Sequence, residues 1–376
     1  MHLEFTAEQD ELRDGVRTML ARECPIALVR EVVEKGAMPD ALWAQMVELG
    51  WPALTVPAPA GGLGMGAVEL AVVVEELGRV LAPGPFVPTV TQFAAVVAEA
   101  GSAEQQARFL GGVAAGEITG TLALVEDDGS IDAGRVSSTA SPDGDGFVLD
   151  GTKAAVLEAA TADEIAVVAR QRGTDGGDGV GAFVVPRDEV SVDPIDAFDA
   201  SRPLARVTLD GVRVGADRVL GEPGPATAAA VGRAVEVATT ALAVETVGAA
   251  QSIFDITLSY AKQREQFGVP IGSFQAIKHK FADMLVALER ARATSYYAAL
   301  TIAEDDDRRS LAASIAKAAA GDCAALLAKE GIQIHGGIGY TWEHDMHLYV
   351  RRVKSNSILF GNAGQHRARV ADLIGL

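Results

Sequence analysis

Cysteine and basic residues are both scarce in this sequence. Two cysteines, Cys24 and Cys323, stand far apart among 376 residues, which argues against a disulfide framework and a thiolate metal site. We expect no bound metal. Lysine and arginine total 32 against 51 aspartate and glutamate residues, so the formal charge is -19. Because a nucleic-acid-binding surface needs a basic excess, this balance argues against nucleic acid as a partner.

Long uncharged apolar runs are also missing. No uncharged apolar run approaches the roughly 20 residues that a membrane-spanning helix needs. No basic and apolar leader opens the chain, so we expect a cytoplasmic protein without a membrane span. The length is sufficient for two or three domains with a large buried core.

The hydrophobic periodicity changes twice along the chain. Apolar residues recur at helical spacing up to about residue 116, as in Leu12, Val16 and Met19. Short apolar runs separated by Gly and Asp follow and predict strands. Long alanine-rich helices complete the chain. This order predicts an α+β fold with an N-terminal helical domain (1–117), a middle β domain (118–222) and a helical C-terminal domain (223–376). The expected strands include 119–125, 146–149, 164–168, 181–185 and 206–212.

One polar turn in the C-terminal domain carries the first functional signal. In YAKQREQFGVPIGSFQAIKHKFADM (260–284), a helix ends near Arg264, and Gly268 and Pro270 force a turn before the next helix. A cation held in a fixed turn beside an aromatic side chain, Phe267, suits a diphosphate with an attached adenine. An ordinary helical hairpin with a solvated Arg264 is the alternative.

A second segment, QIHGGIGY (333–340), lies beyond a long alanine-rich helix. Together with the turn, an opening LEFTAEQDELRDGVRTML and the stretch VPAPAGGLGMGAVELAVVVEELGRVLAPGPF, it resembles the acyl-CoA dehydrogenase family over nearly the whole chain. The resemblance implies a helical domain, a middle β-barrel or sandwich domain and a C-terminal four-helix bundle that builds a tetramer. It also implies FAD-dependent α,β-desaturation of an acyl-CoA thioester, with electrons passed to an electron-transfer flavoprotein.

In that family FAD lies between subunits, and the Arg and Phe of the turn reach the pyrophosphate and adenine of a neighbour's FAD. Coenzyme A is anionic and would also need local cations. The cations of the C-terminal domain could serve this purpose, and a solvated basic face explains their presence equally well. The implied cofactor-binding residues are Arg264, Gln266, Phe267, Gln333, Gly336 and Gly337. The candidate cations are Lys278, Lys280, Arg290, Arg292, Arg351, Arg352 and Lys354.

The resemblance leaves the catalytic base open. A carboxylate whose pKa burial has raised can remove the α proton while the flavin accepts a hydride. Phe360 occupies the family's usual base position and Ala238 its alternative position, and neither can take a proton. Glu245 lies two helical turns beyond Ala238 on the same face, among apolar neighbours, and we predict that it is the base. A structural Glu245 paired with a cation of another helix is the alternative, and Glu236 is a second candidate.

Two further stretches, 243–248 and 351–361, resemble mixed α2β2 acyl-CoA dehydrogenases that act on steroid side-chain thioesters, in which half of the FAD sites are complete. In the middle domain, 125–127 and 155–157 stand where the family carries a Thr and a Trp beside the flavin. We therefore predict a homotetramer or heterotetramer and a β domain that holds no FAD of its own. The alternatives are a non-catalytic partner subunit, a flavin oxidase or monooxygenase on the same fold, and a structural helical assembly protein.

Overall fold

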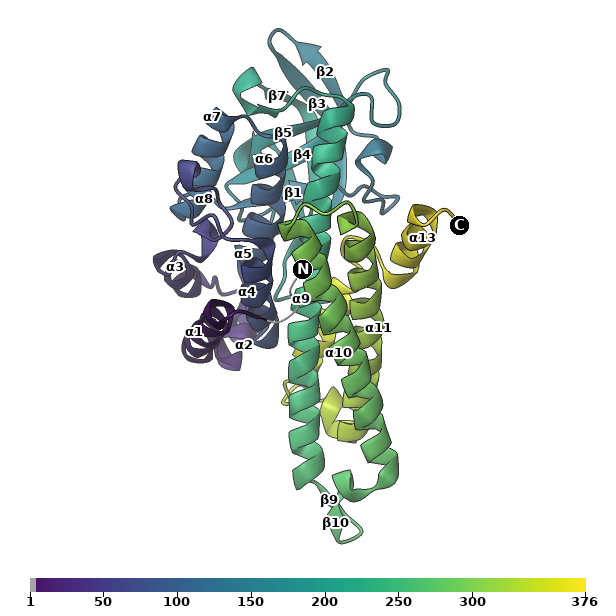
Figure 1. Ribbon diagram of the computed structural model, residues 1–376. Helices are drawn as coiled ribbons and strands as arrows, with labels where there is room; N and C mark the ends of the chain where they lie inside the picture. The colour runs from purple at the N-terminus through teal and green to yellow at the C-terminus, as the bar shows by residue number, and fades with distance from the viewer. Residues whose placement is uncertain (1–4) are drawn as a thin grey trace. The chain divides into compact units, whose positions relative to one another are not determined.

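The structure is a computed structural model that describes residues 5–376, with helices at both ends of the chain and strands between them (Figure 1). This order confirms the predicted α+β fold. The helices are α1 Ala7–Glu23, α2 Ile26–Lys35, α3 Asp40–Glu48, α4 Ala67–Arg79, α5 Phe86–Pro88, α6 Ala94–Ala100, α7 Ala103–Gln105, α8 Gly111–Ala114, α9 Pro225–Gln263, α10 Gln275–Ala303, α11 Arg309–His335, α12 Met346–Asn356 and α13 Ala363–Leu373. The strands are β1 Gly120–Ala123, β2 Thr139–Asp143, β3 Gly146–Leu157, β4 Glu164–Gln171, β5 Val180–Pro186, β6 Ser191–Ile195, β7 Leu204–Val214, β8 Val219–Leu220, β9 Glu265–Gln266 and β10 Val269–Pro270.

The described residues form two compact units. One, the helical unit, contains the chain up to Ala37, Ala71–Ala82 and Thr239–Leu376. The other, the sheet unit, contains Met38–Leu70 and Pro83–Ala238. Helices α4 and α9 contribute residues to both units.

The sheet unit is built on one eight-stranded sheet. Its strands follow the order β6-β7-β3-β2-β4-β5-β8, and β1 pairs in parallel with β4. Residues 165–169 of β4 and 180–185 of β5 are buried, as their uninterrupted apolar sequences require. Strand β3 is longer than predicted because two register shifts against β7 break its alternation.

Three long helices of the helical unit pack through alanine. Ala243 of α9, Ala298 of α10 and the α11 residues Ala312, Ala316 and Ala320 form one buried cluster. Small side chains at these positions allow the helices to pack closely, and Figure 1 shows the three running side by side. The polar residues that α9 carries among its alanines are therefore deeply buried.

Helices α4 and α9 touch through their backbones. A Cβ atom built on Gly78 would overlap the carbonyl oxygen of Glu245, and one built on Gly248 would overlap that of Glu75. Each helix therefore supplies one glycine to this crossing. This contact fixes the backbone position of Glu245.

Two helical segments, Pro225–Gln263 and Arg309–Tyr340, are long and apolar enough to cross a membrane by length and composition. Their most apolar windows are 72% and 67% buried inside the protein. That burial is typical of core helices. It supports the expectation of no membrane span, which stays a prediction.

Candidate functional site

The predicted turn is a two-residue hairpin. Strands β9 and β10 pair antiparallel, and Phe267 and Gly268 between them have φ of +55° and +78°. A hairpin turn with two positive φ values usually carries Asn or Asp followed by Gly. A bulky Phe267 in this conformation is strained, which indicates that the residue has a role other than satisfying the backbone conformation.

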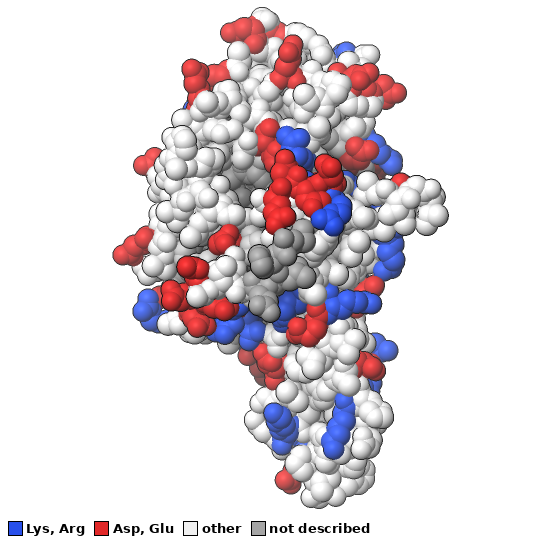
Figure 2. All heavy atoms as spheres, viewed as in Figure 1, with Lys and Arg blue, Asp and Glu red and all other residues white. Residues whose placement is uncertain are grey.

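The hairpin presents a cation and an aromatic ring to solvent. Phe267 is 93% exposed, and Arg264 and Gln266 are exposed as well. The backbone of Arg264 is held, because its N–H donates to Tyr260 and its carbonyl accepts from Ile271, both at 2.8 Å. No carboxylate within residues 5–376 pairs with its guanidinium. Figure 1 places the hairpin at the far end of α9 and α10, where Figure 2 shows few charged side chains.

The glycine-rich segment begins where α11 ends. Gly336 has φ +65° and ψ -141°, a conformation open to glycine alone, and a 3-10 turn Gly336–Tyr340 follows. Among the described residues, apart from the chain neighbours, no heavy atom lies within 4 Å of a Cβ built on Gly336 or Gly337. The backbone of this segment is thus open to close approach by a ligand or another chain, and Gln333 beside it is exposed.

Tyr260 joins the two segments. Its ring stacks on His335 with centroids 4.5 Å apart, and its hydroxyl donates to the His335 carbonyl at 3.4 Å. His335 is 3% exposed, and burial lowers its pKa. Its Nδ1 donates to the Gly331 carbonyl at 2.7 Å, since a carbonyl can only accept. An unpaired cation, an exposed aromatic face and an open glycine backbone fit the adenine-diphosphate end of FAD.

Glu245 lies in a different setting, buried in the helical unit. Its Oε1 is 2.9 Å from Nη1 of Arg352, and its Oε2 accepts from Nδ2 of Asn356 at 3.0 Å. Arg352 is also fully buried and donates to the Leu81 carbonyl at 3.4 Å. These contacts are the ones expected if Glu245 is a structural residue paired with a cation of another helix. Arg352 therefore does not belong to the solvated basic face.

Glu245 lies far from the hairpin along α9. Helix α9 is continuous from Glu245 to Gln263, which separates them by about 27 Å at 1.5 Å per residue. The structure thus brings Arg264, Phe267 and Gly336 into one region through Tyr260 and leaves Glu245 outside it. Glu236, the second candidate, is also buried.

The position of the family's usual base lies in a short loop between α12 and α13. Phe360 is 7% exposed with φ +53°, and its carbonyl accepts from Nε2 of His366 at 2.8 Å. His366 is buried, and burial lowers its pKa to about 4. We missed Lys317, a buried lysine that binds the same loop. A cation within an alanine-rich stretch was the available signal.

In the sheet unit, the residues matched to the flavin ring surround a buried ion pair. Nζ of Lys153 lies 2.7 Å from Oε1 of Glu126, and Oε1 also accepts from the backbone N–H and hydroxyl of Ser138, while Oε2 accepts from those of Ser137. Burial opposes ionisation of Glu126, but Lys153 and these donors lower its pKa to about 2. Burial lowers the pKa of Lys153 to about 8, although Glu126 counters it. Glu126 therefore has a structural role, because it joins Lys153 to Ser137 and Ser138 inside the sheet unit.

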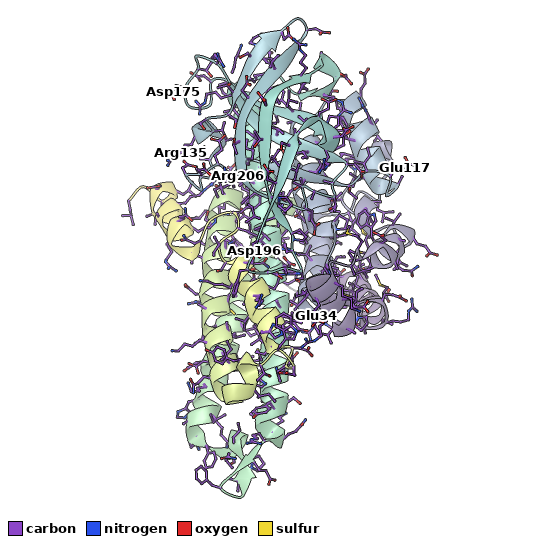
Figure 3. All side chains as sticks on the ribbon, turned by 180° about the vertical axis from the view of Figure 1, so that it is seen from behind. Glu34, Glu117, Arg135, Asp175, Asp196 and Arg206 are labelled. Atoms are coloured by element: carbon purple, nitrogen blue, oxygen red, sulfur yellow. The ribbon has the colours of Figure 1, made fainter. Side chains whose placement is uncertain are left out.

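The two acidic residues that follow Glu126 are also paired. Asp127 lies 3.0 Å from Arg206 on β7, and Asp128 lies 3.1 Å from Arg135; both arginines are labelled in Figure 3. These pairs are largely exposed, so each contributes little to stability. They link the loop after β1 to Arg206 and Arg135, and Val125, which stands where the family carries its Thr, has no hydroxyl.

Comparison with known proteins covers the whole chain. The acyl-CoA dehydrogenase N-terminal, middle and C-terminal domain models match residues 6–117, 121–212 and 229–375. The acyl-CoA dehydrogenase IpdE2 of Mycobacterium tuberculosis is 32% identical, with 94% of this chain and 92% of IpdE2 aligned. FadE34 of the same organism is 35% identical over 98% of this chain, which spans 48% of FadE34. The solved structure of the Tcur3481-Tcur3483 steroid ACAD G363A variant is 34% identical, with a TM-score of 0.87 and coverage of 98% and 97%.

Proposed function

The chain belongs to the acyl-CoA dehydrogenase family, and on that premise we propose that it takes part in the α,β-desaturation of an acyl-CoA thioester. Members of this family are FAD-dependent oxidoreductases. When bound, FAD supplies the acceptor for the hydride that leaves the β carbon. The protein has to bind the thioester, exclude water and remove the α proton.

The observation that carries the proposal is the pairing of the hairpin with the glycine-rich segment. We propose that Arg264 contacts the pyrophosphate and Phe267 the adenine of the FAD of a neighbouring chain, with Gln266 beside them. Gln333, Gly336 and Gly337 would approach the same cofactor through side-chain and backbone groups. The unpaired guanidinium, the 93% exposed ring and the open glycine backbone support this assignment.

The finer parts of the proposal concern substrate and partners. We propose a bulky acyl-CoA of the steroid side-chain class, which the name of the Tcur3481-Tcur3483 steroid ACAD supports. An electron-transfer flavoprotein would receive the electrons, and a homotetramer or heterotetramer in the cytoplasm would be the working form. Glu245 stays the predicted base, and Glu245→Gln tests it.

A second candidate function is favoured by the contacts of Glu245. Both of its carboxylate oxygens are occupied, by Arg352 and Asn356, and Phe360 and Ala238 offer no alternative base. A chain of this kind would act as the non-catalytic partner that completes the FAD site of another acyl-CoA dehydrogenase chain. Its Arg264 side would still be required.

The visible absorption spectrum of the purified chain, taken after adding FAD and removing the excess, tests both candidates. A bound-flavin spectrum that bleaches on adding an acyl-CoA supports a self-sufficient dehydrogenase, and Glu245→Gln should then abolish bleaching if Glu245 is the base. A colourless chain that gains flavin only with a second acyl-CoA dehydrogenase chain supports the partner-subunit candidate. A chain that binds no flavin in either setting contradicts both.

A further inference from the structure

Lys317 is a buried lysine without an acidic partner. It is 2% exposed on α11, and no carboxylate in the described chain forms an ion pair with it. Its Nζ donates to two backbone carbonyls, Asn356 at 2.8 Å and Gly361 at 2.9 Å. Burying an amine is costly unless its hydrogen bonds are specific. The two acceptor carbonyls therefore indicate which part of the chain Lys317 holds in place.

The two acceptors mark the ends of one segment, residues 356–361, which we term the Phe360 loop. Asn356 is the last residue of α12, and Gly361 has φ +91° just before α13. Between them Phe360 adopts φ +53°, a conformation that a bulky residue keeps only when its surroundings impose it. One amine thus bridges both ends of a strained segment.

Other buried side chains hold the same loop from different helices. Asn356 donates its side-chain amide to Glu245 of α9, and His366 of α13 donates to the Phe360 carbonyl. A Cβ on Gly361 would lie 2.9 Å from Nε2 of His366, so a larger residue at 361 would require His366 to move. Lys317 differs from these groups because it alone, among the described contacts, binds both ends.

We propose that Lys317 is the positioning residue of the Phe360 loop: its two hydrogen bonds hold the loop ends together and so fix the side chain presented at residue 360. The role of this loop as a wall of the acyl site rests on the proposed function. The hydrogen bonds themselves do not, since both acceptors belong to this chain. A buried amine is needed here for its donors, and an apolar side chain of equal length would not replace it.

Hydrogen–deuterium exchange on the full-length chain tests the proposal. Lys317→Met keeps an unbranched side chain without donors, and peptides covering 355–362 should exchange about tenfold faster, because local opening no longer breaks two hydrogen bonds. Lys317→Gln retains donors and should fall between Met and wild type. Lys329→Met is the matched control on α11, because the side chain of Lys329 is 78% exposed, and it should leave the loop unchanged.

Unchanged exchange in the loop of Lys317→Met overturns the proposal, because packing alone would then suffice. Equal acceleration in α10, α11 and the loop overturns it too, since a positioning role is local. If Lys317→Met does not fold, Lys317→Gln decides by the same two criteria. If neither variant folds, the role is global stability and the proposal fails.

Turnover by the flavin-loaded assembly supplies the second readout. Lys317→Gln should lower kcat about tenfold with little change in KM, because the distant nucleotide of coenzyme A still binds. A KM effect alone contradicts placement of the loop at the reacting carbons. If wild-type assembly converts no acyl-CoA while the exchange results are as expected, the proposed function fails and the positioning role stands.

Discussion

Oε1 of Glu245 and Nη1 of Arg352 lie 2.9 Å apart, and neither side chain is more than 1% exposed. The pair joins α9 to α12, and Arg352 extends it to the Leu81 carbonyl just beyond α4. Two charges so deeply buried are tolerable only together, because each alone would bear a large desolvation penalty. The pair is therefore sensitive to loss of either partner.

Glu245→Gln should destabilise the protein by about 3–5 kcal/mol, because it leaves the Arg352 guanidinium buried without a counter-charge. Chemical denaturation followed by circular dichroism measures this change. The double variant Glu245→Leu with Arg352→Met is the control and should recover most of the loss, since no charge remains. Wild-type stability in Glu245→Gln, combined with lost activity, would instead indicate a catalytic carboxylate that the arginine does not need.

The wild-type protein should gain stability relative to Lys317→Met as pH rises from about 7 to about 10.5, with a slope of at most about 1.4 kcal/mol per pH unit. Burial lowers the pKa of Lys317 to about 7, so the unfolded chain binds the extra proton across this range. His366 on α13 lies near its amine, and Glu245 is reached through Asn356; neither residue differs between the two proteins. Unfolding midpoints of the wild-type protein and Lys317→Met at several pH values test this prediction. Parallel curves of stability against pH for the two proteins contradict it.

Acid should weaken the sheet unit through Glu126. Its pKa of about 2 in the folded protein, against an ordinary value of 4.5, means that its stabilisation is complete above pH 4.5 and is lost as pH falls toward 2. Glu126→Gln removes this titration, so its unfolding free energy should change less over that interval. Urea titrations between pH 2 and 5 compare the two. Glu164→Gln, which alters an ion pair with Arg218, controls for general loss of charge.

Phe267→Asn should separate stability from cofactor retention. Asn tolerates the left-handed conformation better than Phe, so stability should stay constant or rise by up to about 1 kcal/mol. Retention of FAD by the assembled protein should fall about tenfold, because a stacking face is lost. Phe267→Tyr keeps both the strain and the ring and should match wild type. Equal FAD retention in the Asn and Phe proteins would remove Phe267 from the nucleotide site.

Local patterns predicted the features that are local in origin. Helical spacing anticipated α1, alanine-rich sequence anticipated the long helices of the C-terminal part, apolar runs anticipated β1, β4, β5 and β7, and Gly268 with Pro270 anticipated the hairpin. Strands β2 and β6 were missed because each contains a proline, Pro142 or Pro194, and β6 is mostly exposed. The roles of the predicted site residues and the predicted domain boundaries stay predictions.

Long-range pairing was beyond sequence reasoning. Glu245 and Arg352 are 107 residues apart, and nothing in the sequence near either identifies the other. The apolar surroundings of Glu245 correctly indicated burial but left its role open. Lys317 sits in equally apolar surroundings, and its acceptors are backbone carbonyls, which carry no sequence signal.

The backbone contact between α4 and α9 has a genetic consequence. Every missense change of a glycine codon adds a Cβ atom, and at Gly78 and Gly248 that atom would collide with the carbonyl of the opposite helix. No replacement is conservative at these two positions, however small the new side chain. A scan of all missense variants should therefore find these two positions intolerant of every replacement, while the exposed hairpin residues Arg264 and Gln266 accept substitutions that affect cofactor retention alone.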